Sequence, residues 1–290
     1  MAEVVELVTY PVKGCAAVPL REAALEPAGI ADDRGFLVTT SEGVGRTQRR
    51  DPALALISPE VTRTPAGERL TLRAPGAEAL HVEADLAGPR RGVDMLGRPL
   101  PGIDQGDEAA DWLSEVLGSR SRLFRVPPEN GRITDGLTPG TSRYADSCAV
   151  HLVSRASLDH LNKRLADRGA EPLPMSRFRP NIVVDGWNGE QHAEHAEHAE
   201  HAEYAEDTAR RLRIGGSELG YAKLAIRCAV TLVAQDSAAK RGPEPLRTLA
   251  TYRRAAEGGV AFGAKFAVLR PGTLAVGDPV EVTAWGASEL

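Results

Sequence analysis

The chain lacks the features of a disulfide-bonded or membrane-spanning protein. Its 290 residues include only three cysteines, too few for a disulfide framework or for an iron–sulfur cluster held by four thiolates. This scarcity predicts a reducing, cytoplasmic location. The sequence has no run of 18 apolar residues, and its amino terminus has no basic region followed by an apolar stretch, so we expect neither a membrane span nor export.

Positive charge and aromatic residues are also in short supply. The formal net charge is −5 and the pI is near 5.9, so no global basic field favours nucleic acid or an anionic membrane as a partner. Aromatic residues make up 4% of the chain, whereas glycine (29 residues) and proline (20 residues) are plentiful. This composition is typical of a soluble, turn-rich β protein with an aliphatic core.

Short strand-like runs separated by turn signals dominate the first hundred residues, which predicts a small β-sandwich or barrel. Residues 107–117 break the pattern with apolar side chains at helical spacing, acidic residues in the first turn and Gly118 at the end, so we expect an amphipathic helix there. The expected strands of this half are 4–12, 35–40, 53–58, 69–73 and 80–86.

Residues 126–143 are rich in proline, glycine and polar residues, which predicts a long connection between two domains. A chain of this length exceeds what one core usually serves, although a single all-β domain is possible. We therefore expect one domain over 1–125 and a second over 126–290. The second should be mainly β, with strands at 149–153, 181–184, 212–214, 220–234, 266–269 and 280–282 and helices at 157–168 and 245–254.

Four tandem His-Ala-Glu triplets occupy residues 192–203. Residues three apart are neighbours on a helix, so two or three of the histidines could hold a divalent ion. The same composition describes a solvated, low-complexity insertion on a surface loop, which is the interpretation we prefer.

Cys228 is the most distinctive candidate for chemistry, because it follows Arg227 within the apolar run 224–233. A thiol beside a fixed positive charge can persist as a thiolate and bind a soft metal. However, a cysteine in an apolar strand is more often a small buried hydrophobe, and neighbours in a strand point to opposite faces. The residue pair alone leaves both interpretations open.

Several polar residues stand where they could hold an anion. Lys13 follows a strand in a turn with proline and glycine, where an ammonium group and backbone N–H groups could cradle a phosphate. Arg34 and Arg49 are expected at strand edges in the same half. The run SRFRPN places Arg179 and Asn181 at the entrance of an apolar strand, a position suited to gripping an anionic group. Each of these residues could instead be an ordinary surface group.

Other catalytic motifs are missing from the sequence. It contains no Walker-type or GxGxxG phosphate loop. His151 and His160 have no positioned nucleophile near them in sequence, so nothing proposes a Ser-His-Asp hydrolase.

A set of short motifs follows a fixed order over nearly the whole chain. They are YPVKGC at 10–15, DRGF at 33–36, TQRRDP at 47–52, YADS at 144–147, FRPNI at 178–182, RC at 227–228, EPLRTL at 244–249, FG at 262–263 and PGTLAVGDP at 271–279. This ordered set resembles the MOSC-domain proteins with an N-terminal MOSC β-barrel domain, a family that includes the mitochondrial amidoxime-reducing component. The resemblance implies two β-barrel-like domains, the second a MOSC-type barrel with a few flanking helices.

The resemblance also implies a molybdenum site. Cys228 would be the metal ligand and the catalytic residue, with the dithiolene of molybdopterin, the organic part of the molybdenum cofactor, supplying two more sulfurs. Lys13, Arg34 and Arg179 match positions that anchor the cofactor phosphate in the family. The other implied cofactor-binding residues are Arg49, Asp146, Ser147, Asn181 and Arg227.

The function implied by the resemblance is that of a cytoplasmic molybdenum oxidoreductase. It would remove oxygen from N-hydroxylated small molecules such as amidoximes, hydroxylamines or N-hydroxylated bases. No Cys-rich ferredoxin domain follows residue 282, so electrons would arrive from a separate ferredoxin, flavodoxin or cytochrome-type protein with its reductase. One alternative is a carrier or sulfur-transfer protein that uses Cys228, and another is a binding module that no longer retains the cofactor. Neither nucleic acid nor membrane is expected as a partner.

Overall fold

The structure of the protein, a computed structural model, describes residues 1–65, 67–187 and 203–290. Strands dominate both halves and a few helices flank them, so the expected mainly β fold class is confirmed. The His-Ala-Glu repeat expected as an insertion lies outside the described residues, apart from Glu203. In the described ranges, no helix is both long enough and apolar enough to cross a lipid bilayer.

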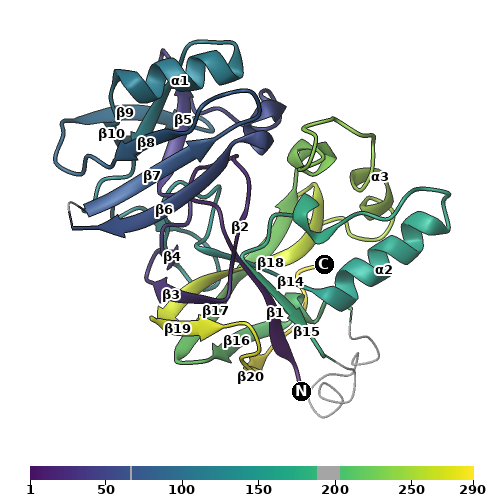
Figure 1. Ribbon diagram of the computed structural model, residues 1–290. Coiled ribbons are helices and arrows are strands. Elements are labelled where there is room, and N and C mark those ends of the chain that lie inside the picture. The colour runs from purple at the N-terminus through teal and green to yellow at the C-terminus, as the bar shows by residue number, and fades with distance from the viewer. Residues whose placement is uncertain (66, 188–202) are drawn as a thin grey trace.

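One eight-stranded sheet supports most of the second half and also contains two strands from the amino-terminal part of the chain (Figure 1). Two of its strands, β14 and β15, are parallel and joined through helix α2 (Arg155–Ala166), whereas the other neighbouring strands are antiparallel. The strand order is β2 (Val18–Leu20), β1 (Glu3–Thr9), β15 (Ile182–Asp185), β14 (Val150–Ser154), β18 (Val260–Arg270), β17 (Ser217–Arg227), β16 (Ala209–Ile214) and β20 (Val280–Trp285).

The part of the first half from β5 to β11 forms a separate lobe in Figure 1, built from two smaller sheets and helix α1 (Asp107–Leu117). This helix has the predicted bounds, buries its apolar face and ends at Gly118, whose φ of 63° lies in the left-handed region that glycine adopts readily. One sheet has the order β5 (Phe36–Thr40), β11 (Ser121–Arg125), β10 (Arg98–Asp104) and β9 (Arg90–Met95), and the other β6 (Ser58–Thr64), β7 (Gly67–Arg73) and β8 (Leu80–Glu83).

Strand pairing crosses the domain boundary that the sequence predicts after residue 125. Strand β1 pairs with β15 of the second half. A third small sheet, in the order β19 (Gly272–Ala275), β3 (Glu22–Glu26) and β4 (Gly29–Ile30), joins the two ends of the chain. The connection over 126–143 contains only the short strands β12 (Ile133–Thr134) and β13 (Gly140–Thr141). The division at 125 stays a prediction, and the described strands show that backbone hydrogen bonds tie the two halves together.

Helix α2 and the short helix α3 (Leu246–Leu249) pack against one face of the large sheet. Helix α2 starts two residues before the predicted position because the Ser154 hydroxyl accepts a hydrogen bond from the Ser157 N–H at 3.1 Å. Below these helices, the rings of Phe178 and Phe262 lie 4.0 Å apart between centroids. This contact anchors the segment that leads to Arg179.

Several predicted elements differ from the structure, among them the following three. Residues 53–58 are not a strand, because Pro52–Leu56 forms a 3-10 turn with Leu54 and Ala55 buried. The predicted strand 220–234 ends at Arg227 because its partner, β18, begins opposite that residue at Val260. The predicted helix 245–254 is only one turn long. Its continuation bonds to β18 instead, through the Ala261 N–H and the Arg253 carbonyl at 2.9 Å.

Gly263 offers a test of how closely the strands behind the site pack. Its φ is 79°, and an added Cβ would lie 2.6 Å from His151 Nε2 and 2.8 Å from the Leu152 carbonyl oxygen. Gly97 has a similar φ of 81° but no atom within 4 Å of such a Cβ. We expect G97A to lower the free energy of unfolding by about 1 kcal/mol, from backbone strain alone. G263A should lower it by about 3 kcal/mol, because the strands must also separate. Urea denaturation followed by circular dichroism measures both, and equal losses would contradict the close packing.

Candidate functional site

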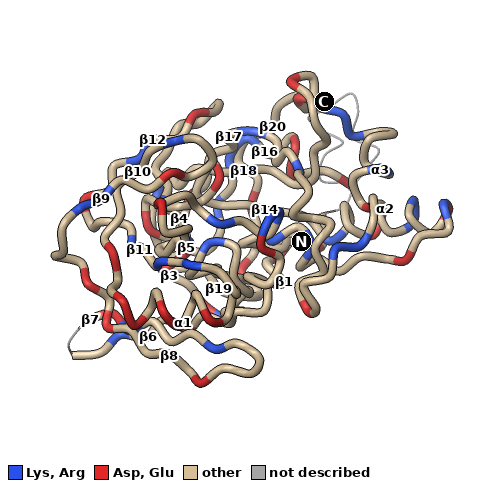
Figure 2. Tube along the Cα trace, turned by 90° about the horizontal axis from the view of Figure 1, so that it is seen from above, with Lys and Arg blue, Asp and Glu red and all other residues tan. Residues whose placement is uncertain are grey.

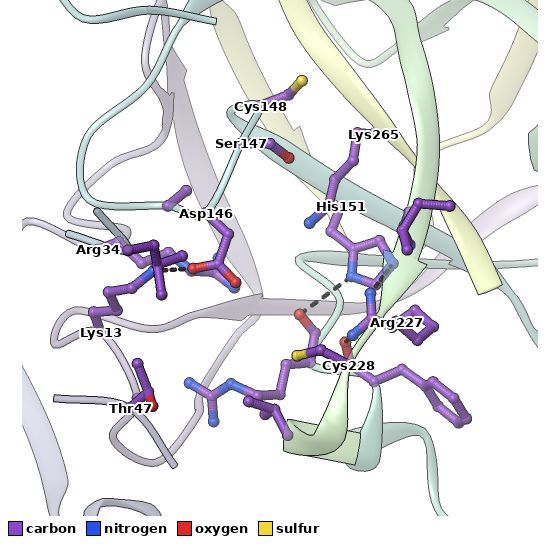
Figure 3. Close-up of a pocket in the computed structure, with 18 of the residues that line it drawn as sticks. Lys13, Arg34, Thr47, Asp146, Ser147, Cys148, His151, Arg227, Cys228 and Lys265 are labelled. Carbon is purple, nitrogen blue, oxygen red and sulfur yellow. Dashed lines mark hydrogen bonds and ion pairs between the residues drawn. The ribbon is translucent and has the colours of Figure 1, made fainter. Parts of the chain in front are cut away.

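A pocket of about 330 Å³ is lined by residues from both halves of the chain. Figure 3 shows Lys13, Arg34 and Asp146 on one side and His151, Arg227 and Lys265 on the other. The structure brings all nine residues predicted from the sequence to this pocket: Lys13, Arg34, Arg49, Asp146, Ser147, Arg179, Asn181, Arg227 and Cys228.

The pocket is strongly basic although the protein as a whole is acidic. Two carboxylates, those of Asp146 and Glu257, line it among the residues described. In Figure 2, acidic segments gather at the edge formed by α1, β6 and β7, whereas basic segments pass β14 and β17. A concave site lined by one sign of charge concentrates ligands of the opposite sign, so the pocket favours anions. The basic residues that line it are Lys13, Arg34, Arg46, Arg49, Arg179, Lys223, Arg227 and Lys265.

Lys13 lies in the turn after β1 and is held by the loop at 144–146. Its Nζ donates a hydrogen bond to the Tyr144 carbonyl at 2.9 Å and forms an ion pair with Asp146. Burial lowers the pKa of Lys13, although the carboxylate opposes this effect. The Lys13 charge in turn lowers the pKa of Asp146, whose side chain remains 60% exposed at the pocket surface. The pair therefore presents its carboxylate, and a partly masked ammonium, to a ligand.

Arg34 is oriented by a buried network behind the pocket wall. Its Nη1 donates to Asp33 and, at 3.1 Å, to the Asn181 side-chain oxygen. The Asn181 amide donates to Asp33 at 3.0 Å and to the Val8 carbonyl at 3.1 Å. These bonds engage both ends of the Asn181 side chain inside the protein. Asn181 therefore acts through Arg34, which it positions.

Two guanidinium groups lie against the ring of Tyr10. Arg34 is 4.5 Å and Arg179 is 4.2 Å from the ring centroid, so both cations are within range of a cation–π interaction with this ring. Both arginines have positive φ values, 48° and 54°, which cost energy for residues other than glycine and persist where the surroundings fix them. Arg179 is fixed by hydrogen bonds to Gln235 and to the Cys15 carbonyl, each at 2.8 Å. A strained backbone at these two residues therefore fixes the positions of two positive charges.

Cys228 comes directly after β17 and is a free, partly exposed thiol. The adjacent Arg227 donates to the Phe178 carbonyl at 2.9 Å and approaches His151 Nε2 at 3.5 Å. Its buried Nε has no hydrogen-bond partner in the described part of the chain. Because Cys228 stands at the end of the strand, it is not the buried strand hydrophobe of the alternative interpretation.

His151 lines the pocket, although no role for it was predicted from the sequence. It is buried, and its pKa is well below the ordinary value, first through burial and then through the charges of Lys265 and Arg227. The neutral ring can donate from Nδ1 to the Arg179 carbonyl at 3.4 Å and accept from Arg227 at Nε2. A polar residue inside the otherwise apolar run VHLV was the available signal for this role.

Residues of the TQRR motif approach the pocket from the first half. Gln48 exchanges two hydrogen bonds with Gln235, at 3.0 and 2.9 Å, and donates to the Gly14 carbonyl at 2.6 Å. Gln48 thereby joins the two halves beside the site, a role that the sequence did not suggest. Arg49 lies exposed in a turn at the pocket, not at a strand edge as expected. Ser147 also lines the pocket, from the loop that precedes β14.

The fold and the site together define a β-rich protein with a basic pocket, suited to anions, beside a free thiol. Comparisons with known families specify it further. A model of the MOSC N-terminal beta barrel domain matches residues 1–120, and a model of the MOSC domain matches residues 139–281. The chain belongs to the family of MOSC-domain proteins with an N-terminal MOSC β-barrel domain, which confirms the resemblance drawn from its motifs.

The sequence similarity to several known proteins extends over most of the chain. Mitochondrial amidoxime reducing component 2 of Rattus norvegicus is 32% identical, covering 93% of this chain and 80% of the relative. Mitochondrial amidoxime-reducing component 1 of Homo sapiens is 32% identical, covering 96% and 82%. Molybdenum cofactor sulfurase of Danio rerio is 30% identical over 89% of this chain but only 31% of that protein.

The comparisons correct one expectation. The sequence predicted a cytoplasmic location, but the amidoxime-reducing relatives are named as mitochondrial proteins, so that prediction is wrong. Its basis was the low cysteine count. Free thiols indicate a reducing environment, which does not by itself distinguish one reducing compartment from another.

The ion pair between Lys13 and Asp146 leads to a prediction about stability and pH. Because D146N leaves the buried ammonium without a counter-charge, we expect a loss of about 1 kcal/mol at pH 7. The pKa of Asp146 is lower in the folded state than its unfolded value of about 3.9, so its contribution is complete above that value. It is lost as the pH falls further, through the folded-state pKa.

Urea denaturation from pH 7 down to pH 3 measures this difference. The gap between the parent and D146N should be constant above about pH 5 and shrink below about pH 4. D135N is the matched control, since it removes the exposed carboxylate that pairs with Lys223 at 2.9 Å and should cost less than about 0.5 kcal/mol. A gap for D146N that widens in acid would contradict the assignment.

Proposed function

We propose that this chain is a molybdenum-cofactor-dependent oxidoreductase that reduces N-hydroxylated compounds, such as amidoximes and hydroxylamines, by oxygen-atom transfer. The observation that carries the proposal is the basic pocket, in which a free thiol, Cys228, lies among arginines and lysines from both halves. The names of the amidoxime-reducing relatives support the substrate class.

The residues present fit a large anionic cofactor that brings a soft metal. Lys13, Arg34 and Arg179 would hold its phosphate, and the unpartnered Nε of Arg227 is a donor that such a ligand could satisfy. Cys228 would be the metal ligand. When bound, the cofactor supplies the two-electron redox chemistry and accepts the oxygen atom. Arg49, Asp146 and Ser147 would line the remaining wall, with Asn181 acting through Arg34.

The protein's own contribution is a preorganised set of charges. Arg34, Arg179 and Arg227 are each fixed by hydrogen bonds to other parts of the chain, so little reorganisation is needed when a ligand binds. Neutral His151 keeps the Arg227 guanidinium beside Cys228 without adding a further charge.

The overall reaction needs an external source of electrons. Reduction of an N-hydroxylated amine consumes two electrons and two protons and releases one molecule of water, as in R–NHOH + 2e⁻ + 2H⁺ → R–NH₂ + H₂O. We propose that a separate ferredoxin, flavodoxin or cytochrome-type protein with its reductase delivers these electrons. The substrate is a small molecule that enters the open side of the pocket.

A carrier or sulfur-transfer function is the second candidate. The similarity to molybdenum cofactor sulfurase favours it, because that relative is named for a different task. Such a protein would hold the cofactor, or a persulfide on Cys228, without turning over a small substrate. The two candidates share the cysteine and differ in turnover.

Metal content of the protein purified from a cofactor-competent host tests the proposed site. We expect near-stoichiometric molybdenum in the parent and a loss of most of it, or altered metal coordination, in C228A, because the thiolate ligand is gone. C148A is the matched control, since Cys148 also lines the pocket but points its thiol toward the Asp135 carbonyl at 3.7 Å. Absence of molybdenum from the folded parent, in a host that loads a known molybdoenzyme, would refute the proposal.

Turnover separates the two candidate functions. Loaded protein supplied with an artificial electron donor should reduce benzamidoxime, and C228A should lose at least about 99% of that activity because the redox centre is no longer ligated. A cyanide-labile persulfide on Cys228, without benzamidoxime reduction, would instead support sulfur transfer.

A further inference from the structure

Three residues form one row across the central strands that face the pocket. His151 on β14 pairs with Lys265 on β18, and Lys265 pairs in turn with Lys223 on β17. The neighbours of Lys265 along its strand, Ala264 and Phe266, are fully buried on the opposite face. Strand alternation therefore directs Lys265 toward the pocket, where Figure 3 shows it on the side away from Lys13.

Lysine is a rare residue in this protein. The whole chain has five lysines among its 35 basic residues, and three of them, at 13, 223 and 265, line the pocket. Lys13 is paired with Asp146, and Lys223 is paired with Asp135 at 2.9 Å. Within the described residues, Lys265 has no hydrogen bond or ion pair. Apart from the exposed Arg49, it is the one basic residue lining the pocket that has no such partner in the described structure.

The surroundings of Lys265 disfavour its positive charge. Arg227 and Arg34 repel it, and the nearby carboxylate of Asp146 is already bound to Lys13. Burial first, and then these arginines, lower the pKa of Lys265 to about 7. The groups that act on it are Arg34, Asp146, Cys148, His151 and Arg227, while Lys223 lies beside it in the row. An anion placed here would relieve the repulsion.

We propose that Lys265 is an anion-binding residue whose ammonium group takes an oxyanion of the pocket's ligand at the wall formed by β18. The inference rests on the proposed function for the identity of that ligand. The oxyanion belongs either to the bound cofactor or to an ionised N-hydroxyl group of the substrate. This second wall lies across the pocket from the Lys13 and Arg34 corner, so the ligand is held from two sides.

Inorganic phosphate bound to cofactor-free protein provides the first test. After reductive ¹³C-methylation, the five lysines give few enough NMR signals for K265M to identify that of Lys265 by its disappearance. Phosphate prefers the charged form, so binding should raise the pKa of Lys265 from about 7 to about 8 or above. A residue with only a structural role would show no such shift.

Phosphate affinity of the variants, measured by calorimetry, provides the second readout. K265M should bind phosphate about tenfold more weakly, and K265R should restore binding because it keeps the charge. K163M is the matched control: it removes an exposed lysine of helix α2 that does not line the pocket, so the affinity should change less than about twofold. Thermal melts of all variants show whether each is folded.

Molybdenum-loaded protein distinguishes the two sources of the oxyanion. A pKa of Lys265 that is already raised in the loaded protein assigns the oxyanion to the cofactor. A pKa that rises only when benzhydroxamate is added assigns it to the substrate. Phosphate binding that moves the signal of Lys13 but not that of Lys265, with unchanged affinity in K265M, would overturn the inference. That result leaves the proposed function standing, whereas a parent without molybdenum refutes the function and leaves the phosphate result intact.

Discussion

Crowding of positive charge in one partly desolvated pocket is the constraint on which the rest of the site depends. Like charges taken out of water repel each other unless each has a partner of its own. The structure meets this requirement from many directions: a carboxylate for Lys13, the ring of Tyr10 for two arginines, and backbone carbonyls for Arg179 and Arg227. The partners of the basic residues, which carry no obvious role in the sequence, therefore allow the positive charges to lie together in the pocket.

These partners explain why the two halves of the chain are joined so closely. Lys13 reaches the pocket because β1, the first strand, pairs with β15 in the large sheet. The backbone carbonyl of Cys15 and the side chain of Gln48 then contact Arg179 and Gln235 from the other half. A site assembled from both halves needs both to be fixed relative to each other, since a shift of about 1 Å would break several of these hydrogen bonds together. The strand pairings across residue 125 supply that rigidity.

The basic groups of the site differ in whether they already have a hydrogen-bond or ion-pair partner within the protein. Paired groups such as Lys13 and Lys223 contribute a fixed field, whereas Lys265 and the Nε of Arg227 keep unsatisfied hydrogen-bonding capacity within the described structure. Neutral His151 connects two arginines without adding to the repulsion. Binding capacity is thus concentrated in a few groups, while the others hold the geometry.

The sequence by itself determined the features that depend on local pattern: the mainly β composition, helix α1 with its glycine end, and the motif residues that meet in the pocket. Only the tertiary structure decided where β17 stops, that His151 and Lys265 share a row, and that Asn181 supports Arg34. The physical reason is that these features depend on hydrogen-bond partners far away in the chain. His151 and Lys265 are 114 positions apart, and only the register of β14 against β18 places them together.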